Sequence, residues 1–416
     1  MKFSKLLLAM AASGIATSAF ATNGYFAHGI GVKAKAMGGA SIAFAEDGFG
    51  AATNPANLAQ VKDGYSIGVS AFAPDRAVNG TSAWATNASL SATADHDGNQ
   101  AADAFAIPEF AYVKTYNDKI NWGVVVYGNG GMNVDYGKAM YDSGANTSSN
   151  LEQLFISPTV SYKVNDRNTV AASLNIVYQT FKATGLNWFI PYTISGADNP
   201  GGHGTDDSMG VGVKLGWTGK LSDALTAGAY YQPKTSMDKF TAYKDLFAQG
   251  GGFDIPETYG VGIAVKASPK TVVALDVTQI NYSGIKSLAN RNNHNTANTD
   301  LGAEDGKGFG WSDMTVYKLG VAHQLDDKTT VRAGWNYGKQ PISADQLDFN
   351  LLAPAVVEHH YTLGLTRALD GNSEVSVHAM YAPNVKITGT GTVGSLYMDN
   401  LQMSQYEIGI QYSKKF

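Results

Sequence analysis

Residues 405–416, QYEIGIQYSKKF, end the chain with a strict alternation of apolar and polar side chains. Tyr406, Ile408 and Ile410 fall on one side of an extended chain, and Glu407 and Gln411 fall on the other. Because successive side chains of a strand point to opposite faces, this segment has one apolar face and one polar face. The pattern is typical of a strand that meets lipid on one side, although a soluble sheet can alternate in the same way.

Period-2 alternation recurs in about fourteen segments between Gly64 and the end of the chain. An even number of antiparallel strands is what a single-chain bacterial barrel requires. We therefore predict an all-β fold, a transmembrane antiparallel β-barrel of about fourteen strands. The predicted strands span residues 65–73, 105–116, 119–127, 154–163, 169–182, 209–218, 224–232, 257–267, 271–281, 314–324, 330–337, 358–368, 374–382 and 405–416.

The connections between these segments alternate strictly between short and long. The short ones are rich in Asn, Asp, Ser, Gly and Pro, which favour tight turns, and the long ones carry most of the irregular sequence. Short periplasmic turns and long extracellular loops produce this alternation, which places both termini in the periplasm. The short connections are 117–118, 164–168, 219–223, 268–270, 325–328 and 369–373; the long ones are 74–104, 128–153, 183–208, 233–256, 282–313, 338–357 and 383–404.

The first residues predict export. Lys2 and Lys5 precede a short apolar run, and Ala19-Phe20-Ala21 is a small-x-small cleavage pattern, so we place a signal peptide at residues 1–21. No later run approaches the ~18 apolar residues of a transmembrane helix. The chain has 47 Gly, 22 Tyr, 17 Phe and 6 Trp, which suits a barrel with aromatic girdles. With no Cys, no disulfide framework stabilises the fold, and closure of a sheet can do so instead.

Charge excludes one class of partner. Without Lys2 and Lys5 the mature chain has 28 basic residues against 35 acidic ones, a net charge of −7, which argues against binding to nucleic acid. Residues 22–63 lack strand alternation and are rich in Gly and Ala. The predicted organisation is therefore a signal peptide (1–21), an N-terminal hatch that plugs the lumen (22–63) and an outer-membrane β-barrel (64–416).

The predicted hatch resembles that of a known family. Its motifs are Gly29-Ile30-Gly31, Met37-Gly38-Gly39-Ala40, Ala45-Glu46-Asp47 and Asn54-Pro55-Ala56. They are similar to those of the FadL/TodX family of outer-membrane long-chain fatty-acid and hydrocarbon transporters, and the Asn-Pro-Ala triplet after an acidic pair is the most specific of them. The resemblance implies a hatch, an internal hydrophobic pocket, a kinked third strand that opens sideways into the membrane, and passive transport without an enzymatic step.

Glycines follow the third predicted strand. Gly128, Gly130 and Gly131 directly succeed residues 122–127, and glycine in a strand favours bulges and bends. Two interpretations are equally open at this point. The glycines either form the kink that the resemblance implies, or they only begin an extracellular loop.

Basic residues are expected in the pocket because family members that carry fatty acids neutralise the cargo carboxylate there. The resemblance places Lys307 at one such position, with a solvated loop lysine as the alternative. The second position falls near Gly185, where this chain has no charge; Lys182 is the nearest substitute, but strand alternation does not promise it the same direction. This departure leaves carboxylate recognition open.

An apolar and aromatic cluster stands in the third long connection, which is unusual for an exposed loop. It lines an entry groove for hydrophobic cargo or forms part of an aromatic girdle at the barrel rim. The cluster consists of Phe181, Leu186, Trp188, Phe189 and Ile190.

The predicted function is passive transport of long-chain fatty acids or similar hydrophobic compounds by a monomer embedded in outer-membrane lipid and lipopolysaccharide. No cofactor, metal site or catalytic residue is predicted. One alternative is an outer-membrane lipid hydrolase, for which His378 is the only lumen-directed candidate. The other is a diffusion porin for polar solutes, against which the hatch segment argues.

Overall fold

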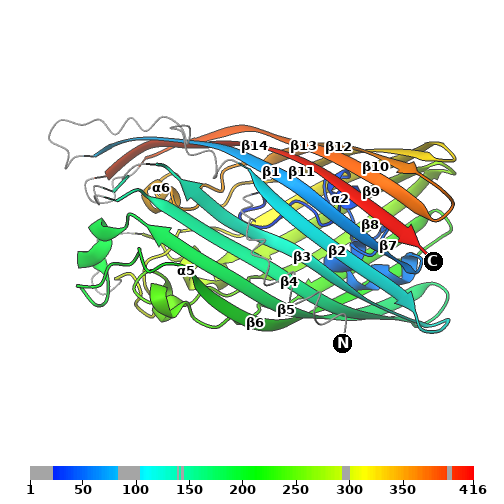
Figure 1. The fold of residues 1–416 in the computed structure, drawn as a ribbon, viewed down its shortest axis with the longest axis horizontal. Helices are drawn as coiled ribbons and strands as arrows, with labels where there is room; N and C mark the ends of the chain where they lie inside the picture. The colour runs from blue at the N-terminus through cyan, green and yellow to red at the C-terminus, as the bar shows by residue number, and fades with distance from the viewer. Residues whose placement is uncertain (1–21, 83–103, 138–139, 142–144, 293–299, 391–395) are drawn as a thin grey trace.

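The structure, a computed structural model, describes residues 22–82, 104–137, 140–141, 145–292, 300–390 and 396–416. In these residues fourteen antiparallel strands form one closed barrel, because β1 pairs with both β2 and β14 (Figure 1). The predicted fold class is confirmed. The strands are β1 (Gly64–Ser82), β2 (Phe105–Thr115), β3 (Ile120–Asp135), β4 (Ser148–Lys163), β5 (Asn168–Thr184), β6 (Asp206–Lys220), β7 (Leu225–Gln232), β8 (Glu257–Ser268), β9 (Thr271–Asn281), β10 (Met314–Asp326), β11 (Thr329–Gly338), β12 (His359–Ala368), β13 (Ser373–Thr388) and β14 (Leu396–Lys415).

Alternation along the strands gives the barrel an apolar exterior. Val211, Leu363 and Ile408 are 62%, 66% and 64% exposed, while the residues beside them in sequence point inward. Ile408 lies opposite Ala71 of β1, so the outward face continues across the closing seam. Such exposed apolar side chains suit a surface that meets lipid rather than water.

Several strands are longer than the alternation predicts, mainly toward the long loops. β1 was expected to end at Ala73 but continues to Ser82, and β14 was expected to start at Gln405 but begins at Leu396. These extensions contain polar residues, so no apolar–polar alternation is visible in their sequence. Backbone pairing continues nonetheless, from Pro74↔Gln405 to Asn79↔Asn400, because ladder hydrogen bonds do not depend on side-chain polarity.

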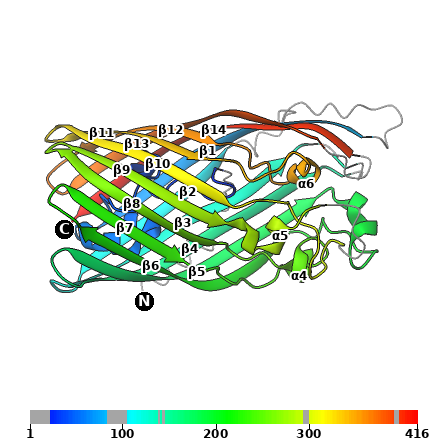
Figure 2. The same ribbon diagram turned by 180° about the vertical axis from the view of Figure 1, so that it is seen from behind.

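Long loops gather at one end of the barrel, together with short helical segments (Figure 2). The short turns and the C-terminus lie at the opposite end (Figure 1). Among the described residues, no helix has the length and apolar character needed to cross a membrane. The loop helices are η3 (Asn187–Tyr192), η4 (Thr241–Tyr243), α4 (Ala248–Gly251), η5 (Tyr282–Gly284), α5 (Lys286–Ala289) and α6 (Leu347–Asn350).

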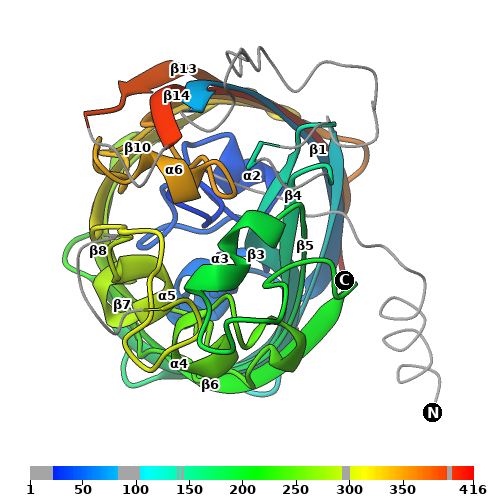
Figure 3. The same cartoon turned by 90° about the vertical axis from the view of Figure 1, so that its left-hand side faces the viewer.

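The segment that precedes β1 lies inside the ring of strands (Figure 3). It contains α2 (Val32–Lys35), α3 (Gly50–Thr53) and η1 (Pro55–Gln60), and most of its residues are buried. We call residues 22–63 the hatch. Because it is folded against the barrel wall, the lumen is filled by backbone and side chains and is not an open channel.

Lumen-facing side chains of the barrel hold the hatch backbone. Asp276 Oδ2 accepts hydrogen bonds from the amides of Ser41 (2.7 Å) and Ile42 (2.9 Å). The hydroxyl of Thr362 accepts from the amide of Gly38 (2.9 Å) and donates to the carbonyl of Ala36 (3.0 Å). Buried hatch amides and carbonyls therefore find partners on the wall, as buried backbone groups require.

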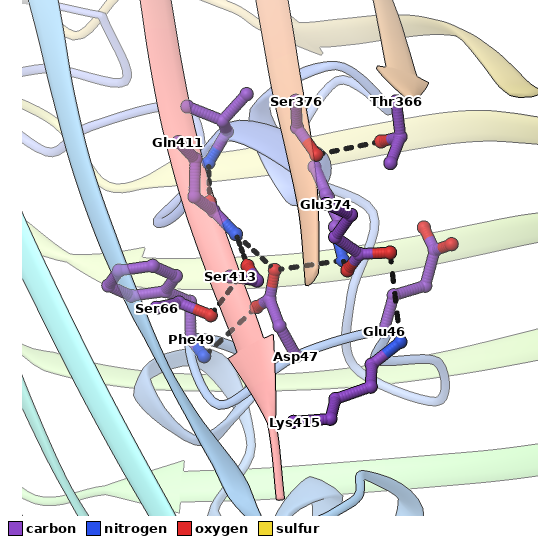
Figure 4. Close-up of polar contacts among 12 residues, drawn as sticks. Glu46, Asp47, Phe49, Ser66, Thr366, Glu374, Ser376, Gln411, Ser413 and Lys415 are labelled. Atoms are coloured by element: carbon purple, nitrogen blue, oxygen red, sulfur yellow. Dashed lines mark hydrogen bonds and ion pairs between the residues drawn. The ribbon is translucent and has the colours of Figure 1, made fainter. Parts of the chain in front are cut away.

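Ionic contacts fasten the hatch near the short-turn end (Figure 4). Glu46 forms a bidentate pair with Arg332 of β11, with both N–O distances at 2.7 Å. Asp47 accepts a hydrogen bond from the Gln411 amide at 2.6 Å, and Lys33 pairs with Glu374 of β13. The acidic pair of the hatch motif thus serves as an attachment point.

Candidate functional site

The end of the hatch nearest the long loops carries an aromatic pair that packs against them. Tyr25 and Phe26 stack with ring centroids 5.0 Å apart. Tyr25 also contacts Phe253, Tyr282 and Trp311 at 6.1, 5.6 and 6.2 Å. These rings belong to one large buried apolar cluster formed by the loops and the adjoining strand ends, which we call the loop cluster.

Four of the five apolar residues predicted in the third long connection contribute to the loop cluster, and Ile190 does not. Phe181 is buried on β5 and meets Tyr243 and Phe247 edge to face, both at 4.7 Å. Phe189 on η3 meets Tyr141 at 4.7 Å and Phe349 at 5.8 Å. Leu186 is also buried, whereas Trp188 and Ile190 are partly exposed.

The two predicted lysines lie in different environments. Lys307 is only 6% exposed and its Nζ sits 5.6 Å from the centre of the Tyr192 ring, which in turn packs 5.1 Å from Trp188. Burial lowers the pKa of Lys307, and the charge of Asp300 opposes that shift. Lys182 is exposed, because it follows Phe181 on β5 and points to the opposite face. The structure therefore brings Lys307, and not Lys182, to the aromatic residues.

The third strand departs from its neighbour at the predicted glycines. Pairing of β2 with β3 ends at Phe110↔Val126, although within the described residues β2 extends to Phe105 and β3 to Asp135. The β3–β4 register shifts between Gly128 and Gly130, which marks a bulge. In this region the barrel wall lacks β2–β3 ladder pairs.

The hatch takes the place of β2 beside β3 at Gly130, where Phe26 forms an antiparallel bridge with it. The amide of Gly131 donates to the carbonyl of Tyr25, and the amide of Ala27 donates to the carbonyl of Asn129, both at 3.0 Å. A Cβ on Gly130 would lie 1.8 Å from the Tyr25 oxygen. Only glycine permits this approach, so the sequence at residue 130 and the path of the hatch are coupled.

The remaining predicted hatch residues shape its fold. Asn54 donates to the carbonyls of Ile42 (2.8 Å) and Trp217 (3.0 Å), caps η1 through the amide of Ala56, and precedes Pro55 at the first position of that helix. Gly31 has a φ of 79° and lies against Phe49. The backbone of Gly29 lies directly against that of Gly39.

Sequence reasoning missed two lysines inside the barrel. Lys214 of β6 and Lys318 of β10 line a cavity of about 70 Å³ between the hatch and the wall. Lys214 donates to the carbonyl of Ala52 (2.6 Å) and Lys318 to that of His28 (3.1 Å). No carboxylate of the described residues forms an ion pair with either. Alternation could have revealed Lys214, because it stands between the outward-facing apolar residues Val213 and Leu215 and therefore points into the lumen.

Comparisons with known proteins agree with this architecture. The family model described as outer membrane protein transport protein (OMPP1/FadL/TodX) matches residues 8–416. No curated protein matches the sequence. The solved structures that it resembles include the Pseudomonas putida toluene transporter TodX, with 18% identity, TM-score 0.66 and coverage of 94% of this chain and 99% of that one. A Pseudomonas aeruginosa FadL homologue has 16% identity, TM-score 0.72 and coverage of 94% and 100%. The Ralstonia pickettii toluene transporter TbuX has 18% identity, TM-score 0.66 and coverage of 94% and 99%.

Proposed function

The chain belongs to the outer membrane transport protein family OMPP1/FadL/TodX, and from this premise we propose that it carries long-chain fatty acids or similarly hydrophobic compounds passively through the barrel. Transport of hydrophobic compounds across the outer membrane is the activity of channels in this family, which are not enzymes. The lipid-hydrolase alternative is therefore set aside. The porin alternative does not suit a lumen that is filled by the hatch.

The loop cluster carries the proposal. Hydrophobic cargo crosses the hydrated outer leaflet poorly. An apolar binding surface that is reached from the long loops would let such cargo enter the barrel instead. The cluster contains buried aromatic rings from several loops and strand ends, among them Phe181 and Phe189. Burial of apolar cargo at ~25 cal/mol per Å² gives affinity without specific hydrogen bonds.

Cargo passage requires movement of the hatch. The cavity beneath Phe26 measures about 70 Å³, whereas pockets for small ligands usually enclose about 300–1,000 Å³. The hatch therefore leaves too little room for cargo at this point, and we propose that the structure is a closed state. We propose that displacement of residues 25–27 from β3 opens the unpaired stretch between β2 and β3, through which cargo leaves sideways into the membrane.

Lys307 is proposed to bind the carboxylate of acidic cargo. It is a buried ammonium among aromatic rings, and a hydrogen bond to a charged group in such surroundings contributes about 1.5–3 kcal/mol. Its neighbours Tyr192 and Trp188 provide apolar surface for the adjoining chain.

The test measures oleate binding and uptake. In a strain that lacks the gene, we expect growth on long-chain fatty acid or hydrocarbon to slow and to recover with the wild-type chain. Lys307→Gln should weaken oleate binding by about 10- to 100-fold while leaving a neutral hydrocarbon unaffected. Lys182→Gln is the matched control and should change neither. Unchanged growth of the deletion strain on every such substrate would contradict the proposed function.

The orientation and surroundings of the barrel are part of the proposal. We place the short turns and both termini in the periplasm and the long loops outside, with one chain surrounded by outer-membrane lipid and lipopolysaccharide. The signal peptide at residues 1–21 lies outside the described residues and stays a prediction, as do the proposed limits of the hatch and barrel. Protease added to intact cells should cut only the long loops.

A further inference from the structure

A second cluster of functional side chains lies where the hatch meets β13 and β14, and transport as proposed above makes no use of it. His28 comes from the hatch, His378 from β13 and Glu407 from β14. All three side chains are fully buried. Their nitrogen and oxygen atoms converge, so that one ligand atom from each lies within 4.8 Å of the others.

The spacing of these atoms is close to that of a metal site. His28 Nδ1 lies 3.8 Å from Glu407 Oε2, and His378 Nε2 lies 3.3 Å from Glu407 Oε1. Bonds of about 2.0–2.1 Å in a tetrahedron place ligand atoms about 3.3 Å apart. Side-chain adjustments of about 1 Å or less would therefore bring the three groups onto one ion.

The imidazole of His28 has a specific need for a partner. Neither of its ring nitrogens makes a hydrogen bond to any of the described residues, although the side chain is completely buried. A buried polar atom without a partner costs about 1–3 kcal/mol. A buried ring nitrogen that lacks a partner therefore points to a ligand that binds there.

The surrounding backbone keeps these rings in place. Gly409 lies opposite His378 in the β13–β14 register, and a Cβ there would lie 2.5 Å from the ring. On the hatch side, a Cβ on Gly39 would lie 1.8 Å from the carbonyl of His28, which also accepts from Lys318. Two glycines thus make room for the two histidines.

Acidic and basic groups both border the cluster. Glu407 and Glu109 carry two negative charges, and Lys35 carries one positive charge, 2.9 Å from Glu407 and 3.3 Å from Glu109. These three groups and two neutral imidazoles sum to −1, and Lys318, which donates to the His28 carbonyl, adds a positive charge beside them. Lys35 and His378 both approach Oε1 of Glu407, while Oε2 faces His28, so an ion bound by the three ligands shares Glu407 with the Lys35 ammonium.

We propose that His28, His378 and Glu407 bind one divalent transition-metal ion of the zinc class, which ties the hatch to β13 and β14. Two imidazoles and a carboxylate suit zinc, whereas calcium and magnesium prefer oxygen ligands. Because the ligands come from both the hatch and the wall, the bound ion opposes displacement of the hatch. The inference stands on its own geometry and does not depend on the identity of the cargo.

The experiment uses the full mature protein, purified in detergent, stripped with a chelator and titrated with zinc chloride. We expect about one zinc ion per chain, and replacement by cobalt should give the visible absorption of a tetrahedral nitrogen–oxygen site. His28→Gln and His378→Gln should each weaken zinc binding by about tenfold or more, since even residues that only support metal ligands lower affinity that much. His203→Gln, which changes an exposed loop histidine, is the matched control and should bind normally.

Two further measurements keep the test decisive. A folded barrel migrates differently from the unfolded chain in unheated gels, which identifies variants that bind no zinc because they do not fold. In the wild type alone, zinc should raise the temperature at which the hatch is lost. Absence of stoichiometric zinc in the folded wild type would overturn the proposal, and so would loss of zinc in His203→Gln with retention in His378→Gln.

Discussion

Substitution of Gly130 by alanine tests how tightly the hatch is held against β3. The new Cβ would lie 1.8 Å from the Tyr25 oxygen, whereas real Cβ atoms keep at least 3.0 Å from such a neighbour, so hatch and strand must separate by 1.2 Å. That separation disrupts the two backbone hydrogen bonds beside it, Gly131 to Tyr25 and Ala27 to Asn129. At about 0.5–1.5 kcal/mol each, their loss amounts to about 1–3 kcal/mol.

This free energy acts on local opening rather than on the whole barrel. It should raise the population of the displaced hatch by about 5- to 150-fold. Hydrogen exchange of the peptide that contains residues 24–28 measures this population directly, because exchange of its amides requires opening. Gly284→Ala is the matched control, since a Cβ there has open space.

A contrary result would be clear. If exchange of residues 24–28 in Gly130→Ala stayed within about twofold of the wild type, the close contact between hatch and β3 would not determine hatch position. The proposed sideways exit would then lose its structural basis. A general loss of protection in all strands would instead show that the barrel itself had been disrupted. Gly284→Ala should produce neither effect.

Three further outcomes are expected. Burial raises the pKa of Glu46, but the attraction of Arg332 and of nearby lysines lowers it by more, so the pKa falls overall. The stabilisation that Glu46 gives to the hatch should therefore be present above about pH 4.5 and be lost as the pH falls below that value. Urea unfolding of the wild type and of Glu46→Gln at pH 7 and pH 3.5 would show this loss. Asp276→Ala removes the acceptor of two buried hatch amides and should weaken the hatch by about 2–6 kcal/mol, measured as faster exchange of residues 40–43. Because burial lowers the pKa of Lys307, oleate affinity should decline with rising pH earlier than an ordinary lysine would allow, and Lys307→Gln should abolish that dependence in a titration of binding against pH.

The strands and their order could be predicted because alternation is a local property. In residues 405–416 each pair of neighbours already shows which side chain faces lipid, and that information needs no knowledge of the partner strand. The same applies to the long and short connections. Strand ends were less predictable, since β1 and β14 remain paired through polar residues whose pattern has no visible period.

Placement of the site residues required the tertiary structure. Phase along a strand shows that Phe181 and Lys182 face opposite ways, but it does not show that Lys307 meets Tyr192. Lys307 lies far along the chain from Tyr192, and only the packing of two long loops brings them together. Loop conformation depends on many weak contacts, which no short motif encodes.

The sequence by itself determined the barrel, the number of its strands and the presence of a glycine-rich segment to fill it, because each follows from periodicity or composition within a few residues. Only the tertiary structure decided what that segment touches. His28 reaches His378 and Glu407 across 350 residues of sequence or more, and Gly130 meets Tyr25, because closure of β1 on β14 sets the width and stagger of the barrel. Those dimensions are a property of all fourteen strands together, so no segment carries them alone.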